Sequence, residues 1–172
     1  MSNSLRRKYS KLADEAEGKT EPRPNRNHKR FNLNYWLDKG RKVDRSAQKH
    51  LADLGLNRLI DEQQFVFADN LRVVCFDGFE VSIQASAYHY CYPKETWNES
   101  KYYERFELGM PNKRCELLMP YCENADCPTK SVYPQVPREV VQAMIEAHGG
   151  IQMLDNTRPH FPDIVPGEKP DG

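Results

Sequence analysis

A chain of 172 residues, of which 38% are hydrophobic and 29% charged, is long enough for one domain with a buried core and for polar segments beside it. It has no apolar run close to the ~18 residues that a membrane span needs, and its first residues are charged where a signal peptide would be apolar. We therefore expect a cytoplasmic protein with no membrane partner, in which the five cysteines are reduced.

The charges are unevenly distributed along the chain. Residues 1–45 carry thirteen Lys and Arg against six Asp and Glu, whereas residues 46–172 carry twelve against nineteen. A basic arm on an acidic body favours an anionic partner, or contact of the arm with its own domain or with a neighbouring subunit of a homo-oligomer. We expect residues 1–43 to form this arm, partly disordered, with a short helix over residues 5–17.

An α+β domain is expected over residues 44–154. Its first element is a helix over residues 44–54, which Asp44 caps and Gly55 ends. Ala47, Leu51 and Leu54 lie on one face of that helix.

The apolar period then changes from helical to two, which predicts strands. Asp77-Gly78 is a strong hairpin signal, and the returning strand places Phe79, Val81, Ile83 and Ala85 on one face. The expected strands are residues 65–68, 71–76, 79–86, 102–110 and 115–121.

Residues 137–148 predict a helix that begins at Pro137 and ends at Gly149. Its apolar stripe is Val140, Val141, Met144 and Ile145. Strands in hairpin order followed by one helix indicate the α+β class: a small antiparallel sheet with a C-terminal packing helix, preceded by a helical basic N-terminal region. The proline-rich residues 155–172 are expected to be a disordered tail.

The second face of the strand over residues 79–86 is polar, and a run of aromatic residues follows it. Neutral hydrogen-bonding groups with one cation suit a small polar ligand, although such a face can also simply meet water. Aromatic side chains with polar tips suit recognition better than bond-breaking. The candidate ligand-binding or interface residues are Ser82, Gln84, Ser86, Tyr88, His89, Tyr90 and Arg105.

The arm offers a second candidate surface, in which aromatic and basic residues alternate. Aromatic faces stack on bases and Lys or Arg neutralise phosphate, so the segment suits single-stranded nucleic acid or nucleotides. The alternative is that its aromatic side chains dock on the domain core or on a neighbouring subunit. The candidate nucleic-acid or phosphate contacts are Phe31, Tyr35, Trp36, Lys39, Arg41 and Lys42.

Metal and catalytic chemistry have weaker support. His89 and Cys91, together with Cys122 and Cys127, could supply four zinc ligands, but the compact CxxC spacing is absent. Cys91 as a nucleophile would need an imidazole within hydrogen-bond reach. The sequence contains no phosphate-binding glycine loop and no HExxH motif. We therefore expect no catalytic residue and no cofactor, and keep a Cys- or zinc-dependent enzyme as the weakest alternative.

The segments GFEVSIQASAYHYCYP, ERFELGMP, LLMPYCE and SVYPQVPREVVQAMIEAHGGI resemble a family of small uncharacterised bacteriophage accessory proteins, over residues 78–151. The resemblance implies a phage-encoded protein that acts in the cytoplasm of the host cell. Our leading hypothesis is a non-enzymatic binding protein that blocks or sequesters a host component, either a host-defence protein or a nucleotide-type signal. A single-stranded nucleic-acid-binding protein that uses the basic aromatic arm is the alternative.

Overall fold

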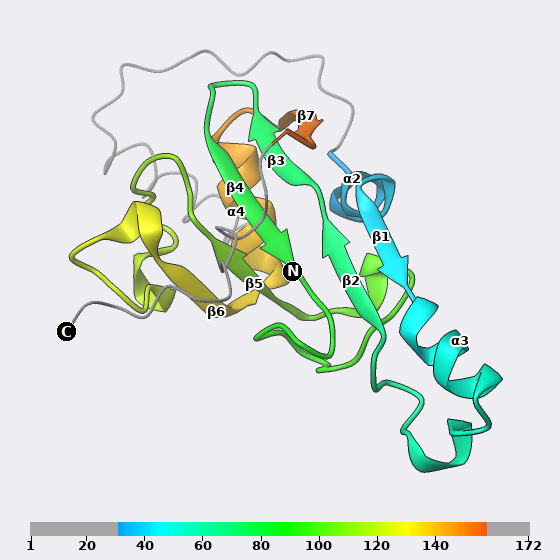
Figure 1. The fold of residues 1–172 in the computed structure, drawn as a ribbon. Helices are drawn as coiled ribbons and strands as arrows, with labels where there is room; N and C mark the ends of the chain where they lie inside the picture. Colours follow the sequence, from blue (N-terminus) through cyan, green and yellow to red (C-terminus); the bar gives the residue numbers. More distant parts are fainter. Residues whose placement is uncertain (1–30, 158–172) are drawn as a thin grey trace.

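The computed structural model describes residues 31–157, which form three α-helices and two antiparallel sheets (Figure 1). The larger sheet has the strand order β6-β5-β4-β3-β7, and β1 and β2 form the smaller one. The expected α+β class is therefore confirmed. Within residues 31–157, no helix is long and apolar enough to cross a membrane.

The central hairpin follows the sequence pattern closely. β3 (Arg72–Cys75) and β4 (Glu80–Gln84) pair antiparallel, and Gly78 occupies the turn between them with φ +85°. The Asp77 carboxylate accepts a hydrogen bond from the Phe79 amide at 2.9 Å, which closes the turn. The predicted apolar face of the returning strand is buried, and it contributes Phe79, Val81, Ile83 and Ala85 to the core.

Three further strands complete the larger sheet. β5 (Arg105–Gly109) lies within the predicted strand over residues 102–110, whereas β6 (Val132–Pro137) and β7 (Ile151–Asp155) were not expected. Both unexpected strands lie at the edges of the sheet. β6 contains two prolines, which a central strand does not tolerate and an edge strand does.

The C-terminal helix α4 (Arg138–Ala147) packs on the larger sheet, as expected (Figure 1). Its stripe of Val140, Val141, Met144 and Ile145 is buried. Gly149, with φ +86°, follows the helix end, and its amide donates to the Glu146 carbonyl. Pro137 precedes the first helical residue and does not occupy it.

The strand predicted over residues 115–121 is wrong. This stretch forms successive turns, and it ends in the 3-10 helix η3 (Met119–Tyr121). Leu117 and Leu118 are consecutive and both buried, which a strand with one buried face cannot provide. Local bonds, such as Leu118 N–H to the Cys115 carbonyl at 3.1 Å, satisfy the backbone instead.

The ordered domain begins earlier than residue 44. Helix α2 (Leu33–Lys39) buries Leu33 and Leu37 in the main core, and β1 (Arg41–Asp44) pairs with β2 (Phe67–Asn70). The C-terminal part of the expected arm is thus built into the fold. The helix expected over residues 5–17 lies outside the described residues. Of the tail expected over residues 155–172, Asp155 ends β7, and the part from residue 158 onward lies outside the described residues.

Helix α3 (Ser46–Asp53) confirms the predicted ending but not the predicted packing. Leu56 N–H donates to the Leu51 carbonyl at 2.9 Å around Gly55, which is the expected helix stop. Asp44 lies one residue before the N-cap position, although its side chain accepts from the Ser46 amide. No residue of α3 is buried: Ala47 and Leu51 of its apolar stripe are half-buried, and Leu54, which follows the helix, is exposed.

Four short 3-10 helices lie in the connections between these elements. The first of them follows α3, the second precedes β5, and the other two lie between β5 and β6. Their bounds are η1 (Asn57–Leu59), η2 (Ser100–Tyr102), η3 (Met119–Tyr121) and η4 (Pro128–Lys130).

Candidate functional site

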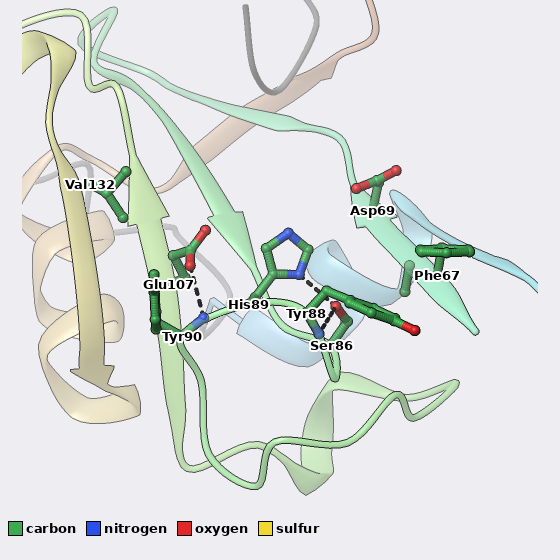
Figure 2. Close-up of a pocket in the computed structure, with 9 residues that line it drawn as sticks. Phe67, Asp69, Ser86, Tyr88, His89, Tyr90, Glu107 and Val132 are labelled. Carbon is green, nitrogen blue, oxygen red and sulfur yellow. Dashed lines mark hydrogen bonds between the residues drawn. The ribbon is translucent and has the colours of Figure 1, made fainter. Parts of the chain in front are cut away.

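A cavity of about 520 Å³ lies between β2 and β5, beside the segment that follows β4 (Figure 2). Pockets for small ligands commonly have volumes of ~300–1,000 Å³. β2 forms one wall, β5 and β6 form the opposite wall, and residues 86–90 lie between them. The lining residues are Phe67, Ala68, Asp69, Ser86, Tyr88, His89, Tyr90, Glu107 and Val132.

The polar face of β4 beside the cavity is a buried hydrogen-bond network. The Gln84 amide accepts from Asn70 N–H at 2.7 Å, and it donates to the Asn70 carbonyl at 2.8 Å and to Ser82 Oγ at 3.0 Å. Asn70 Nδ2 donates in turn to the Ile83 carbonyl at 2.8 Å. Ser82 and Gln84 are therefore buried structural groups, because their polar atoms bind neighbouring strands.

His89 is fixed in orientation at the centre of the cavity. Its Nδ1 lies 2.7 Å from Ser86 Oγ, and the same hydroxyl oxygen accepts from the Tyr88 amide at 3.1 Å. When the Ser86 hydroxyl donates to Nδ1, a neutral ring carries its proton on Nε2. The Ser86 contact thus sets which edge of the imidazole is turned to the cavity (Figure 2).

Glu107 supplies a carboxylate from β5 that is almost completely buried, at 6% exposure. Its Oε2 accepts from the Tyr90 amide at 2.8 Å. Burial raises the pKa of this carboxyl above its ordinary value, and the nearby Glu123 adds to the increase. Burial therefore makes the ionised form of the Glu107 carboxyl more costly in the folded state.

Aromatic rings form the rim. Phe67 and Tyr88 stack with centroids 4.9 Å apart at 22°, and both rings are exposed. The Tyr88 hydroxyl accepts from the Phe65 amide at 2.9 Å, which holds the stacked pair against β2. Tyr90 is exposed at the opposite rim, with Lys94 Nζ 5.5 Å from its ring centroid. A flat ligand group would meet ring faces here.

Hydrogen bonds to β5 and β6 anchor the segment that carries the Tyr88 and Tyr90 rings. The Tyr90 carbonyl accepts from Gln135 N–H at 2.9 Å, and the Cys91 carbonyl accepts from Gln135 Nε2 at 3.1 Å. Tyr92 forms a bridge to Arg105 at the start of β5. The cavity wall is therefore tied to β5 and β6 by backbone bonds, and its shape is set before any ligand arrives.

The sequence pattern identified part of this site. Of the seven candidates, Ser86, Tyr88, His89 and Tyr90 line the cavity, Ser82 and Gln84 lie buried beside it, and Arg105 is exposed and outside its lining. The pattern missed Phe67, Ala68, Asp69, Glu107 and Val132. Glu107 did carry a signal, because alternation placed it on the polar face of its strand.

The basic and aromatic candidates near the N-terminus do not form one surface. Phe31 and Trp36 pack against the core, while Tyr35 is 58% exposed. Lys39 Nζ lies 5.2 Å from the Trp36 ring centroid, and exposed Lys42 is opposite Asp69 in the β1–β2 register. The Arg41 guanidinium donates to Asn70, Ala85, Trp97 and Tyr103 of its own domain.

The candidate zinc ligands lie in two different settings. His89 binds Ser86, and the Cys91 thiol contacts the carbonyls of Ser86 and Pro93 at 3.1 and 3.4 Å. Cys122 and Cys127 lie in the connection between η3 and η4. Across residues 31–157, no three His, Cys, Asp or Glu side chains are grouped to hold a metal ion.

Cys91 is expected to resist alkylation in the folded protein. The thiol is 1% exposed, and burial raises its pKa to about 11, so the reactive thiolate is scarce near pH 7.5. Brief iodoacetamide treatment followed by peptide mass mapping should label the half-buried Cys122 and Cys127 first, and all five cysteines after denaturation. Labelling of Cys91 as fast as Cys127 would contradict this and restore Cys91 as a candidate nucleophile.

Comparison with known proteins gives no relative to guide the assignment. No protein-family model, no curated protein and no solved structure matches this chain.

Proposed function

We propose that this is a non-enzymatic binding protein whose cavity between β2 and β5 holds a small ligand. One observation carries the proposal: the cavity combines a fixed polar wall, formed by Ser86, His89 and Glu107, with an exposed aromatic rim. Prearranged polar groups beside stacking surfaces are typical of recognition sites, because little ordering remains to be done when a ligand binds.

The chemistry of the cavity favours binding over reaction. The thiol of Cys91, which follows the lining residue Tyr90, is directed to two backbone carbonyls and has a raised pKa. The Ser86 hydroxyl contacts His89 Nδ1 and also accepts a hydrogen bond from the Tyr88 amide, and this arrangement fixes the His89 ring. The Ser86 hydroxyl lies within reach of the imidazole, as base activation of a nucleophile requires, but Ser86 is 1% exposed and its oxygen already accepts the Tyr88 amide, so a substrate has poor access to it.

Within this proposal, the ligand is a nucleotide-type signal and the protein sequesters it in the cytoplasm of an infected bacterium. The bacteriophage context comes from the sequence resemblance over residues 78–151. The aromatic rim supports a ligand with a flat ring, since every nucleobase offers a face for stacking. The nucleic-acid alternative has less support, because Phe31, Trp36 and Arg41 contact the protein's own domain.

The test is capture of the ligand from a bacterial lysate. The full-length protein is incubated with filtered lysate, washed, denatured, and the released small molecules are identified by mass spectrometry. We expect one small molecule in stoichiometric amount, and its loss in Tyr88→Ser, which removes one ring of the stacked rim pair. Tyr35→Ser, an exposed tyrosine that does not line the cavity, is the matched control. Equal recovery from both variants, or recovery of no small molecule, would contradict the proposal.

A further inference from the structure

We infer that the ligand presents a flat group with adjacent N–H donors to this cavity, such as the edge of guanine or a guanidinium. The inference rests on the proposed function and names the part of the ligand that the cavity recognises. Two carboxylates carry it, one from each wall: Asp69 on β2 and Glu107 on β5 (Figure 2).

The sign of the charge excludes phosphate as the recognised group. A phosphate inside the cavity would meet both carboxylates, and Glu123 adds negative potential at Glu107. The nearby cations lie beside the cavity and do not line it: Lys94 against the Tyr90 ring, and Lys42 opposite Asp69 on β1. A phosphate carried by the ligand would therefore project outward, toward these lysines.

The position of Glu107 determines which hydrogen bonds it can offer. Oε2 accepts one hydrogen bond from the Tyr90 amide, which leaves it a second acceptor site, and the carboxylate as a whole faces the cavity (Figure 2). An ionised carboxylate only accepts hydrogen bonds, and its two oxygens match two parallel N–H donors. Guanidinium groups and the N1/N2 edge of guanine both present such a pair.

The rim fits the same flat group. Tyr88 and Tyr90 are both exposed on opposite sides of His89, and Lys94 lies over the Tyr90 ring. Tyrosine faces attract cations and stack on nucleobases. The combination of a buried acceptor and exposed rings therefore suits a flat donor that is cationic or rich in N–H groups.

Glu107→Gln gives a sharp test because it keeps the shape of the side chain but places a hydrogen-bond donor where the carboxylate offers an acceptor. The Tyr90 amide still requires an acceptor, so the glutamine oxygen turns toward it and the NH₂ group faces the cavity, where it repels N–H donors. We expect affinity to fall by about 10- to 100-fold, the usual effect of losing a charge-assisted bond. Glu62→Gln, an exposed glutamate away from the cavity lining, is the matched control.

Two probes separate the two sources of this chemistry. Calorimetry compares the affinity of the protein for guanosine with its affinity for inosine, which lacks the 2-amino group. It likewise compares agmatine with butylamine, which lacks the guanidinium. Preference for guanosine over inosine, weakened by Glu107→Gln, supports a guanine ligand. Preference for agmatine over butylamine, weakened in the same way, supports a guanidinium ligand. Neither preference, or binding unchanged in Glu107→Gln, overturns the inference.

The same variant provides a readout of folding. Because burial raises the pKa of Glu107, the cost of its charge grows as the pH rises above the ordinary carboxyl range. Glu107→Gln should therefore melt at a higher temperature than the parent at pH 7.5 and at the same temperature near pH 4. A higher melting temperature combined with weaker binding excludes misfolding as the cause. A captured ligand without an N–H donor edge would overturn this inference and leave the proposed function intact.

Discussion

Replacing Arg41 with alanine is expected to lower the free energy of unfolding by about 3 kcal/mol. Its guanidinium joins four separate parts of the domain. Nε donates to the Trp97 carbonyl at 2.9 Å, Nη1 to Asn70 Oδ1 at 2.9 Å, and Nη2 to the Ala85 carbonyl at 2.8 Å and the Tyr103 hydroxyl at 3.0 Å. Truncation leaves these acceptors without their donor and removes the cation from above the Tyr103 ring.

Arg41→Lys separates geometry from charge. An ammonium cannot donate in the forked pattern that the four acceptors define, so we expect most of the stability loss to remain. Lys42→Ala is the matched control, since Lys42 is exposed on the same strand and should change stability by less than about 0.5 kcal/mol. Urea unfolding followed by circular dichroism measures all three. Equal stability of Arg41→Ala and Lys42→Ala would contradict a structural role for Arg41.

This result would also decide between two interpretations of the basic segment. If Arg41 contacted phosphate, its substitution would weaken oligonucleotide binding and reduce the salt dependence of that binding, while the fold would be preserved. If Arg41 is structural, its substitution destabilises the fold. The sequence shows only that Arg41 is basic and close to aromatic residues, and both interpretations predict that.

Local patterns predicted the elements that local interactions determine. Asp77-Gly78 specifies its turn through a positive φ and an Asp side-chain bond, both internal to four residues. Helix α4 carries its own buried stripe and its own glycine stop. Strand alternation likewise placed Val81 and Ile83 in the core correctly.

Other elements depend on partners that are distant in the sequence. β1 exists because it pairs with β2, more than twenty residues away, and nothing within residues 41–44 indicates that partner. In the stretch 115–121, consecutive apolar residues resemble a buried strand, but i to i+3 backbone bonds satisfy it locally. Short apolar runs do not distinguish these outcomes.

The candidate site shows the same division. Residues 86–90 were predicted because they are consecutive and chemically distinctive. The opposite walls come from Phe67, Asp69 and Glu107, which approach this segment only when β2 and β5 take their places beside β4. The polar face of β4 was correctly separated from the apolar face, but its burial depends on Asn70 from another strand.

Arg138→Ala is expected to have a comparably large effect, a loss of about 3 kcal/mol in the free energy of unfolding. Arg138 begins α4, and its guanidinium connects this helix with two distant segments, α2 and residues 100–103. Nε donates to the Tyr103 carbonyl at 2.8 Å, Nη1 to Asn34 Oδ1 at 2.6 Å, and Nη2 to the carbonyls of Ser100 and Tyr103. Burial lowers the pKa of Arg138 from its ordinary value, and the neighbouring Glu139 and Asp38 oppose that shift.

Arg114→Ala is the matched control for this variant, because Arg114 is exposed and pairs with Glu116 alone among the described hydrogen bonds and ion pairs. We expect Arg114→Ala to change the free energy of unfolding by less than about 0.5 kcal/mol, as for other exposed pairs.

Arg138 and Arg41 share a partner: Arg138 donates to the Tyr103 carbonyl, and Arg41 donates to the Tyr103 hydroxyl. Their double variant should therefore lose less stability than the two single losses added together, since the first substitution already loosens Tyr103. Strict additivity in urea unfolding would show that the two arginines act independently, and that Tyr103 does not link β1 to the start of α4.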